Sequence, residues 1–144
     1  MARDDGDGED DESTLDIATR LERLARLLRQ AGHAGGLVPA QWEVLRYLAR
    51  DNRLSRSPGA LARYLGSTKG TISQSLQTLL KKGLVTRQTR SDDERHVLLA
   101  LTATGQTLLA QDPLRTIATG IDALGGKTRR RFAKGLAEIG RAHV

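Results

Sequence analysis

The chain contains no cysteine, three prolines and little aromatic surface, with Phe, Trp and Tyr making up 3% of its 144 residues. The absence of cysteine excludes thiol-based redox sensing and agrees with a reducing cytoplasm, where we expect the protein to reside. Since aromatic residues are scarce, aliphatic side chains must supply the core. No apolar run reaches the roughly 18 residues that a transmembrane helix requires, so no membrane span is predicted.

The residue patterns of catalytic and metal sites are also missing. The three histidines, His33, His96 and His143, have no acid or cysteine at ligand spacing, so no zinc site is expected. Residues 32–36 are rich in glycine but follow no predicted strand, unlike a phosphate-binding loop. No nucleophile elbow or pair of catalytic carboxylates is present. The sequence therefore predicts a protein that is not an enzyme and needs no cofactor.

Charge is distributed unevenly along the chain. Residues 1–13 carry seven acids and one arginine, whereas the remaining chain carries 22 basic and 10 acidic side chains. We expect residues 1–13 to be a disordered acidic tail, because they lack the apolar side chains that drive folding. They also lack the basic start and apolar segment of a signal peptide. The basic body indicates a polyanionic partner.

Residues 57–83 predict two helices joined by a turn. Ser57 is a suitable N-cap, Pro58 suits the first helical position, and Gly66 ends the first helix. The second helix begins with Ser67 or Thr68 as its N-cap. Its apolar stripe consists of Ile72, Leu76, Leu79 and Leu80. The opposite face carries Gly70, Thr71, Gln74, Gln77, Thr78 and Lys81, and no acid.

This polar face is suited to reading DNA. Gln can pair bidentately with adenine, while Ser and Thr pair with several base acceptors. Lys69 and Lys81 supply attraction to phosphates. The alternative is the ordinary solvated face of a helix in a bundle.

The next segment predicts a β-hairpin, or wing. Residues 84–90 are β-prone, Val97, Leu99 and Leu101 alternate, and residues 91–94 form a polar turn between them. An arginine at such a tip can enter a narrow minor groove, and Asp93 can hold its guanidinium in place. The alternative for the acidic tip is a solvated turn. The predicted DNA-binding residues of the whole segment are Ser57, Ser67, Thr68, Lys69, Thr71, Ser73, Gln74, Gln77, Lys81, Arg87, Arg90, Asp93 and Arg95.

Helices are predicted on both sides of this segment. Residues 14–31, 39–49 and 128–142 each show a helical apolar stripe, and residues 102–124 form a helix that Pro113 kinks or breaks. Trp42, Arg46 and Tyr47 are candidate ligand-binding residues, although Trp42 also suits the role of core anchor. The first and last helices carry more apolar surface than one small core can cover. We therefore expect a two-fold dimer, with an operator whose half-sites lie about one DNA turn apart.

Two clusters of arginine on these outer helices have open interpretations. Arg20, Arg23, Arg26 and Arg29 recur every three residues, either as a solvated face or as a contact for the acidic tail or DNA. Residues 129–131 are three arginines in the first turn of the last helix, where they oppose the helix dipole. We expect a partner group to compensate them, such as an acid of the other subunit.

Three motifs in order resemble the MarR family of bacterial winged-helix regulators: VPAQWEVLRYLA (38–49), LARYLGSTKGTISQSLQTLLKKGLV (61–85) and DDERHVLLALTATG (92–105). The family's wing usually carries Asp-Arg-Arg, and here Glu94 replaces the middle arginine. The resemblance implies a mainly α winged helix-turn-helix with about six helices, in which residues 39–102 bind DNA and residues 14–36 and 103–144 form the dimerisation helices of a single domain over residues 14–144. It further implies a homodimeric, ligand-responsive repressor that binds a palindromic operator. A helical protein-interaction module and a nonspecific architectural DNA binder are the alternatives.

Overall fold

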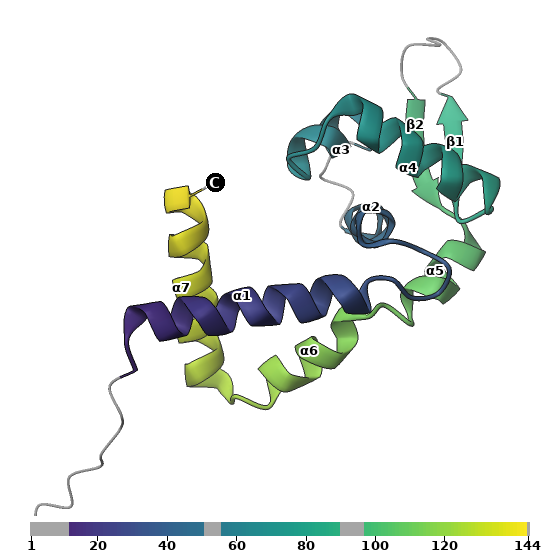
Figure 1. The fold of residues 1–144 in the computed structure, drawn as a ribbon. Helices are drawn as coiled ribbons and strands as arrows, with labels where there is room; N and C mark the ends of the chain where they lie inside the picture. Colours follow the sequence, from purple (N-terminus) through teal and green to yellow (C-terminus); the bar gives the residue numbers. More distant parts are fainter. Residues whose placement is uncertain (1–11, 51–55, 90–96, 144) are drawn as a thin grey trace, which may run out of the picture.

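The computed structural model of the chain describes residues 12–50, 56–89 and 97–143 (Figure 1). These ranges contain seven helices and one two-stranded antiparallel sheet. In chain order the elements are α1 (Thr14–Ala31), α2 (Pro39–Ala49), α3 (Pro58–Tyr64), α4 (Lys69–Lys81), β1 (Val85–Thr89), β2 (Val97–Leu101), α5 (Ala103–Leu109), α6 (Leu114–Asp122) and α7 (Gly126–His143). The prediction of a mainly helical winged fold is confirmed.

The core lies in one lobe, formed by α2 to α5 and the hairpin (Figure 1). Its fully buried large side chains come from α2, α3, α4 and β2, and they are Trp42, Val44, Leu45, Leu61, Leu76, Leu79 and Leu99. The indole Nε1 of Trp42 donates a hydrogen bond to the carbonyl of Ala34 at 3.2 Å, so its one polar atom is satisfied. Trp42 therefore anchors the core, as one of its two sequence interpretations predicts.

Thr102 and Gly105 join the base of the hairpin to α5. The backbone N–H of Thr102 donates to the Leu84 carbonyl at 3.1 Å, and its hydroxyl donates to the Gly83 carbonyl at 2.6 Å. The same hydroxyl oxygen accepts from the N–H of Gly105, which makes Thr102 the predicted N-cap. A β-carbon on Gly105 would lie 2.1 Å from the Leu84 carbonyl oxygen. This close approach requires glycine.

The predicted interruption near Pro113 is a full break between two helices. α5 ends at Leu109 and α6 begins at Leu114, which is why seven helices replace the expected six. Asp112 stabilises the start of α6, because its carboxylate accepts from the N–H of Leu114 at 2.9 Å. The last helix begins at Gly126 rather than Thr128. Gly125 alone makes the turn, with a positive φ of 76°.

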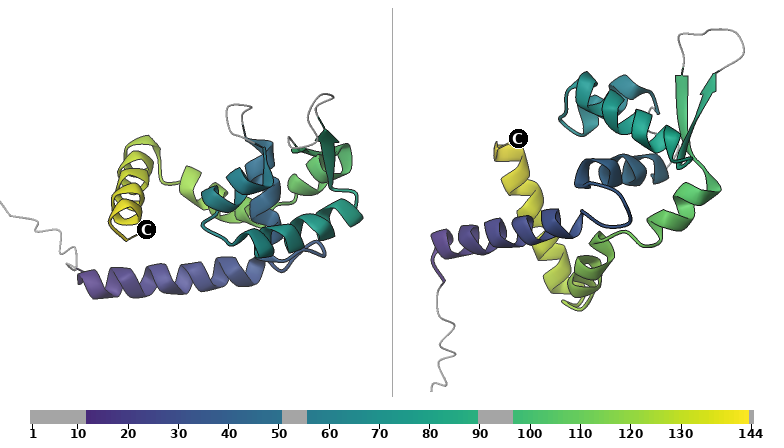
Figure 2. Two further views of the ribbon diagram at one scale, coloured as in Figure 1. Left: turned by 90° about the horizontal axis from the view of Figure 1, so that it is seen from above. Right: turned by 45° about the vertical axis from the view of Figure 1, so that its right-hand side comes forward.

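The outer helices extend away from the lobe, and α1 crosses α7 (Figures 1 and 2). An apolar cavity of about 320 Å³ lies between these two helices, lined mainly by Ile17, Leu21, Leu24, Phe132, Leu136 and Ile139. The predicted apolar stripes are present, but their largest side chains remain exposed in the protomer. Within the described ranges, no helix is long and apolar enough to cross a membrane.

Candidate nucleic-acid interface

Helices α3 and α4 form the predicted helix-turn-helix. Ser57 caps α3 by accepting a hydrogen bond from the N–H of Ala60 at 3.1 Å, and Thr68 caps α4 by accepting from Thr71 at 3.2 Å. Gly66 makes the turn between them with a positive φ of 60°. The backbone N–H of Ser67 donates to the Ala62 carbonyl, so Ser67 closes α3 and Thr68 is the true N-cap of α4.

The two faces of α4 differ sharply in exposure. Ile72, Ser75, Leu76 and Leu79 are buried against the lobe. The exposed residues include six of the predicted DNA-binding side chains, which are Lys69, Thr71, Ser73, Gln74, Gln77 and Lys81. The helix contains no acid, so the exposed face presents only hydroxyl, amide and ammonium groups. Packing of the buried face fixes the orientation of this polar face.

Thr78 does not belong to the outer face to which the sequence assigned it. Its side chain is half-buried, and its hydroxyl donates to the Gln74 carbonyl at 3.2 Å. This contact is the usual way in which a mid-helix threonine satisfies its hydroxyl. Thr78 therefore offers no free hydroxyl donor to a ligand on that face.

The hairpin stands beside α4 (Figure 1) and carries one described arginine. Arg87 pairs with Leu99 in the antiparallel register, so the two side chains share one face of the sheet. Leu99 and Val85 on this face are buried, whereas Arg87, directly opposite Leu99, is exposed. Arg87 thus places one cation at the border of the face that packs on the lobe. The remaining predicted wing residues, Arg90, Asp93 and Arg95, lie outside the described residues.

The three candidate ligand-binding residues have different surroundings. Trp42 is 0% exposed and Tyr47 is 4% exposed, so neither offers surface to a ligand in this arrangement. The Arg46 guanidinium forms a two-point ion pair with Asp112, with Nε–Oδ2 and NH2–Oδ1 distances of 2.6 and 2.8 Å. Arg46 also lines a cavity of about 450 Å³ between α1, α2 and Leu114. The structure therefore brings one of the three predicted residues to a cavity.

The surroundings of Asp112 lower the pKa of its carboxyl. Burial raises the pKa of its carboxyl, but hydrogen bonds from Arg46 and from the Leu114 N–H, together with the charges of Arg46 and Arg115, outweigh burial. The net pKa lies below its ordinary value, so Asp112 is an anion at neutral pH. It joins α2 of the lobe to the corner between α5 and α6.

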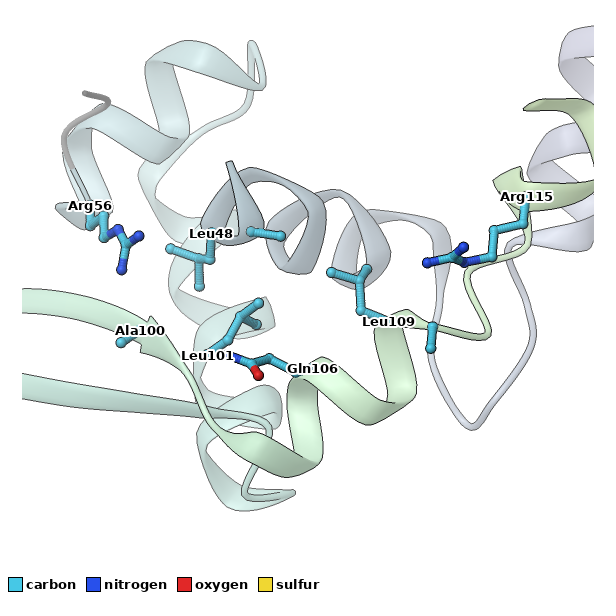
Figure 3. Close-up of a pocket in the computed structure, with 9 residues that line it drawn as sticks. Leu48, Arg56, Ala100, Leu101, Gln106, Leu109 and Arg115 are labelled. Atoms are coloured by element: carbon cyan, nitrogen blue, oxygen red, sulfur yellow. The ribbon is translucent and has the colours of Figure 1, made fainter. Parts of the chain in front are cut away.

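A further cavity of about 360 Å³ lies between α2, β2, α5 and α6 (Figure 3). Arg56 and Arg115 lie at its opposite ends, with Leu48, Leu101 and Leu109 between them. The sequence analysis missed both arginines. They are 59 positions apart and belong to no common motif, so only the folded chain brings them to one cavity.

The lobe has the architecture of a winged helix-turn-helix, with α4 in the position of the recognition helix. The model of the MarR family matches residues 36–96. The HTH-type transcriptional repressor YetL of Bacillus subtilis (strain 168) is 36% identical over 78 residues, which are 53% of this chain and 46% of that protein. The chain thus matches about half the length of this curated relative.

Solved structures extend the likeness to the outer helices. The S. aureus MepR–DNA complex matches with a TM-score of 0.69 and 18% identity, covering 92% of this chain and all of that one. The PcaV transcriptional regulator of Streptomyces coelicolor, in complex with its natural ligand, matches with a TM-score of 0.65 and 20% identity over the whole of both chains. These likenesses show a shared fold. The match to the MarR family model covers 61 of the 144 residues of this chain.

Proposed function

We propose that this protein is a sequence-specific regulator of transcription that binds double-stranded DNA as a homodimer and represses the genes it controls. The observation that carries the proposal is the exposed, acid-free polar face of α4 beside the hairpin. The match of residues 36–96 to the MarR family model and the likeness to a repressor support it. The protein acts in the cytoplasm, without catalysis or a cofactor.

The exposed residues of α4 and the wing divide into two roles. Gln74 and Gln77 read base edges, assisted by the hydroxyls of Thr71 and Ser73. Phosphates are bound by Lys69, Lys81 and Arg87, and by the caps of α3 and α4 through Ser57, Ser67 and Thr68. Arg90, Asp93 and Arg95 complete the wing contact, with Asp93 orienting an arginine.

Residues 14–36 and 103–144 form the dimerisation helices, and residues 39–102 form the DNA-binding lobe. The apolar side chains of α1 and α7 that remain exposed in the protomer support this division. A two-fold axis through these helices places two copies of α4 in successive major grooves. The operator is therefore a palindrome.

The base-reading role of Gln74 gives a direct test. Gln74→Ala should reduce the preference for the operator over random duplex by about 1–3 kcal/mol, because a bidentate base contact is lost. Gel-shift titrations of both duplexes at fixed salt measure the two affinities. An equal loss on both would contradict base reading, and equal affinity of the unchanged protein for both would indicate architectural binding.

We further propose that a small-molecule effector releases the DNA. The cavities between the lobe and helices α1 and α6 support this, because a ligand held there contacts both the lobe and the outer helices. Such a ligand must bind the DNA-free arrangement more tightly than the DNA-bound one. Calorimetric titration of candidate ligands with and without operator measures this difference, and equal affinities would exclude the proposed release.

A further inference from the structure

The outward face of α7 carries a stripe of four cations. Lys127, Arg130, Lys134 and Arg141 follow at spacings of three, four and seven residues, which place them on one side of a helix. All four are exposed. The side of α7 that lines the cavity with α1 carries Phe132, Leu136 and Ile139 instead. The cationic stripe therefore points away from α1.

The stripe has little compensating charge within the described part of the chain. Lys134 alone forms an ion pair there, with Glu138 at 3.9 Å, and both side chains are more than half exposed. Lys127 and Arg130 lie in or next to the first turn of α7, where their charge opposes the helix dipole. A bound polyanion would relieve both the mutual repulsion and the dipole effect.

The same chain carries a segment with the matching charge. Residues 4–12 contain seven acids among nine residues. The last of them, Glu12, forms an ion pair with Arg20 at 2.5 Å, and Arg20 lines the cavity between α1 and α7. The acidic segment therefore ends beside the helix that carries the stripe.

Lengths also match. The eight residues from Asp4 to Asp11 span up to about 26 Å at roughly 3.3 Å per residue. The fourteen helical steps from Lys127 to Arg141 rise about 21 Å, and a helix with its side chains is about 10 Å across. Half the circumference of the helix is about 16 Å, so the segment is long enough to pass around α7 and reach part of the stripe. The first turn of α1 lies far from α4 in all three views (Figures 1 and 2), so the stripe of α7 is nearer to the segment than α4 is. The arginines of α1 are the other cationic surface near the segment, since Arg20 pairs with Glu12.

We propose that the acidic segment Asp4–Asp11 binds the cationic stripe of α7 and covers part of it. The segment thereby competes with phosphate backbones for the stripe and confines polyanion binding to α4 and the wing. This role is independent of which operator the protein recognises.

Cross-linking tests the position of the segment, because the five lysines of the chain divide into two groups. Lys69, Lys81 and Lys82 belong to α4 and its C-cap, and Lys127 and Lys134 to the stripe. A zero-length carbodiimide reagent applied to the full chain at low salt should join carboxylates of residues 4–11 to Lys127 and Lys134, as identified by mass spectrometry of peptides. These products should vanish at high salt. Products confined to the α4 lysines, or none from the segment, would overturn the proposal.

Heparin chromatography tests the competition. A tail variant with Asp4, Asp5, Asp7, Asp10 and Asp11 changed to Asn and Glu9 to Gln should elute at higher salt than the unchanged protein, while Glu12 keeps its pair with Arg20. In a stripe variant, with Lys127, Arg130, Lys134 and Arg141 all changed to Gln, the same tail changes should give a much smaller shift.

The matched control changes Arg23, Arg26, Arg29 and Arg63 to Gln, which removes the same charge from other exposed positions. In this control the tail changes should raise the elution salt as much as in the unchanged protein. A smaller shift in this control than in the stripe variant would place the tail on the arginines of α1 and overturn the proposal. An equal shift in the stripe and control variants would mean that the tail acts through net charge alone, and the proposal would fail. Thermal unfolding of each variant verifies that it is folded.

Discussion

The DNA-binding lobe and the outer helices differ in how much of a core each completes. The lobe encloses its own large apolar side chains, seven of which are less than 2% exposed. Helices α1, α6 and α7 contain no buried residue within the described chain, and Ile17 and Ile139 are each 53% exposed. Both regions have amphipathic helices, yet only one of them closes a core within the protomer.

This difference shows which part of the fold depends on a second copy. The lobe has apolar faces on three helices and a sheet that meet one another, whereas the apolar faces of α1 and α7 meet across a cavity of about 320 Å³. Burying apolar surface contributes roughly 25 cal/mol per Å², so these open faces gain most from association. The stability of the outer helices should therefore depend on protein concentration, while that of the lobe should not.

The largest effect is expected from Leu136→Asp. This change places a carboxylate in the apolar cavity between α1 and α7, where an unpaired charge is costly. The protein should become monomeric, and affinity for a palindromic operator should fall by more than about 100-fold, because two linked half-site contacts become separate. Analytical ultracentrifugation and gel-shift titration measure the two effects.

Ala137→Asp is the control for this change. The neighbouring residue is exposed and lies on the outer side of α7, so the same new charge should leave the dimer intact. Dimers of the Leu136→Asp variant at micromolar concentration would contradict the proposed interface.

The lobe should be most sensitive at Gly105. A β-carbon there would lie 2.1 Å from the backbone carbonyl oxygen of Leu84, and backbone atoms cannot turn aside as a side chain can. Forcing extra atoms into a packed site costs about 1–3 kcal/mol and occasionally more, and we expect Gly105→Ala to reach the upper end of this range. Urea unfolding of the two proteins at equal concentration measures the loss.

Gly120→Ala is the matched control in the outer helices. No atom lies within 4 Å of the added β-carbon in α6, so alanine should stabilise the helix by up to about 1 kcal/mol. A destabilisation similar to that of Gly105→Ala would mean that an effect other than the contact with Leu84, such as the dimer, governs both positions.

Much of the lobe was predictable because its signals are local. Caps such as Ser57 and Thr102 act on neighbours three residues away, and the apolar periodicity of α4 identifies its buried face. The exposed positions of Gln74 and Gln77 follow from the same periodicity. The two errors at helix level, Thr78 and Gly126, lie at the edge of a stripe and at a helix end. There the local signal is weakest.

Features that depend on distant parts of the chain were not predictable. Arg46 and Asp112 are separated by 66 positions, and neither lies in a sequence motif that predicts an ion pair between them. The cavity that brings together Arg56 and Arg115 depends on how α6 turns after the break at Pro113, and sequence indicates the break but not the direction. The requirement for glycine at position 105 likewise arises only from the contact with Leu84.

The ion pair between Arg46 and Asp112 connects the two regions, and Asp112→Asn should weaken it with a smaller effect than Gly105→Ala. The variant should lose about 1–2 kcal/mol of the free energy of unfolding at neutral pH, because a charge-assisted hydrogen-bond pair becomes neutral on one side.

This loss should depend on pH. The pKa of Asp112 is lowered in the folded protein, so the contribution of its charge to stability is fully present above the unfolded pKa of about 3.9. It is lost as pH falls through the lower folded value. The difference in free energy of unfolding between the two proteins should therefore be constant near neutrality and shrink below about pH 4, as measured by urea unfolding across that range. Asp122→Asn breaks a more exposed pair with Arg129 and should change stability by about 0.5 kcal/mol or less. A difference for Asp112→Asn that persists unchanged in acid would show that packing, and not its charge, joins the lobe to the outer helices.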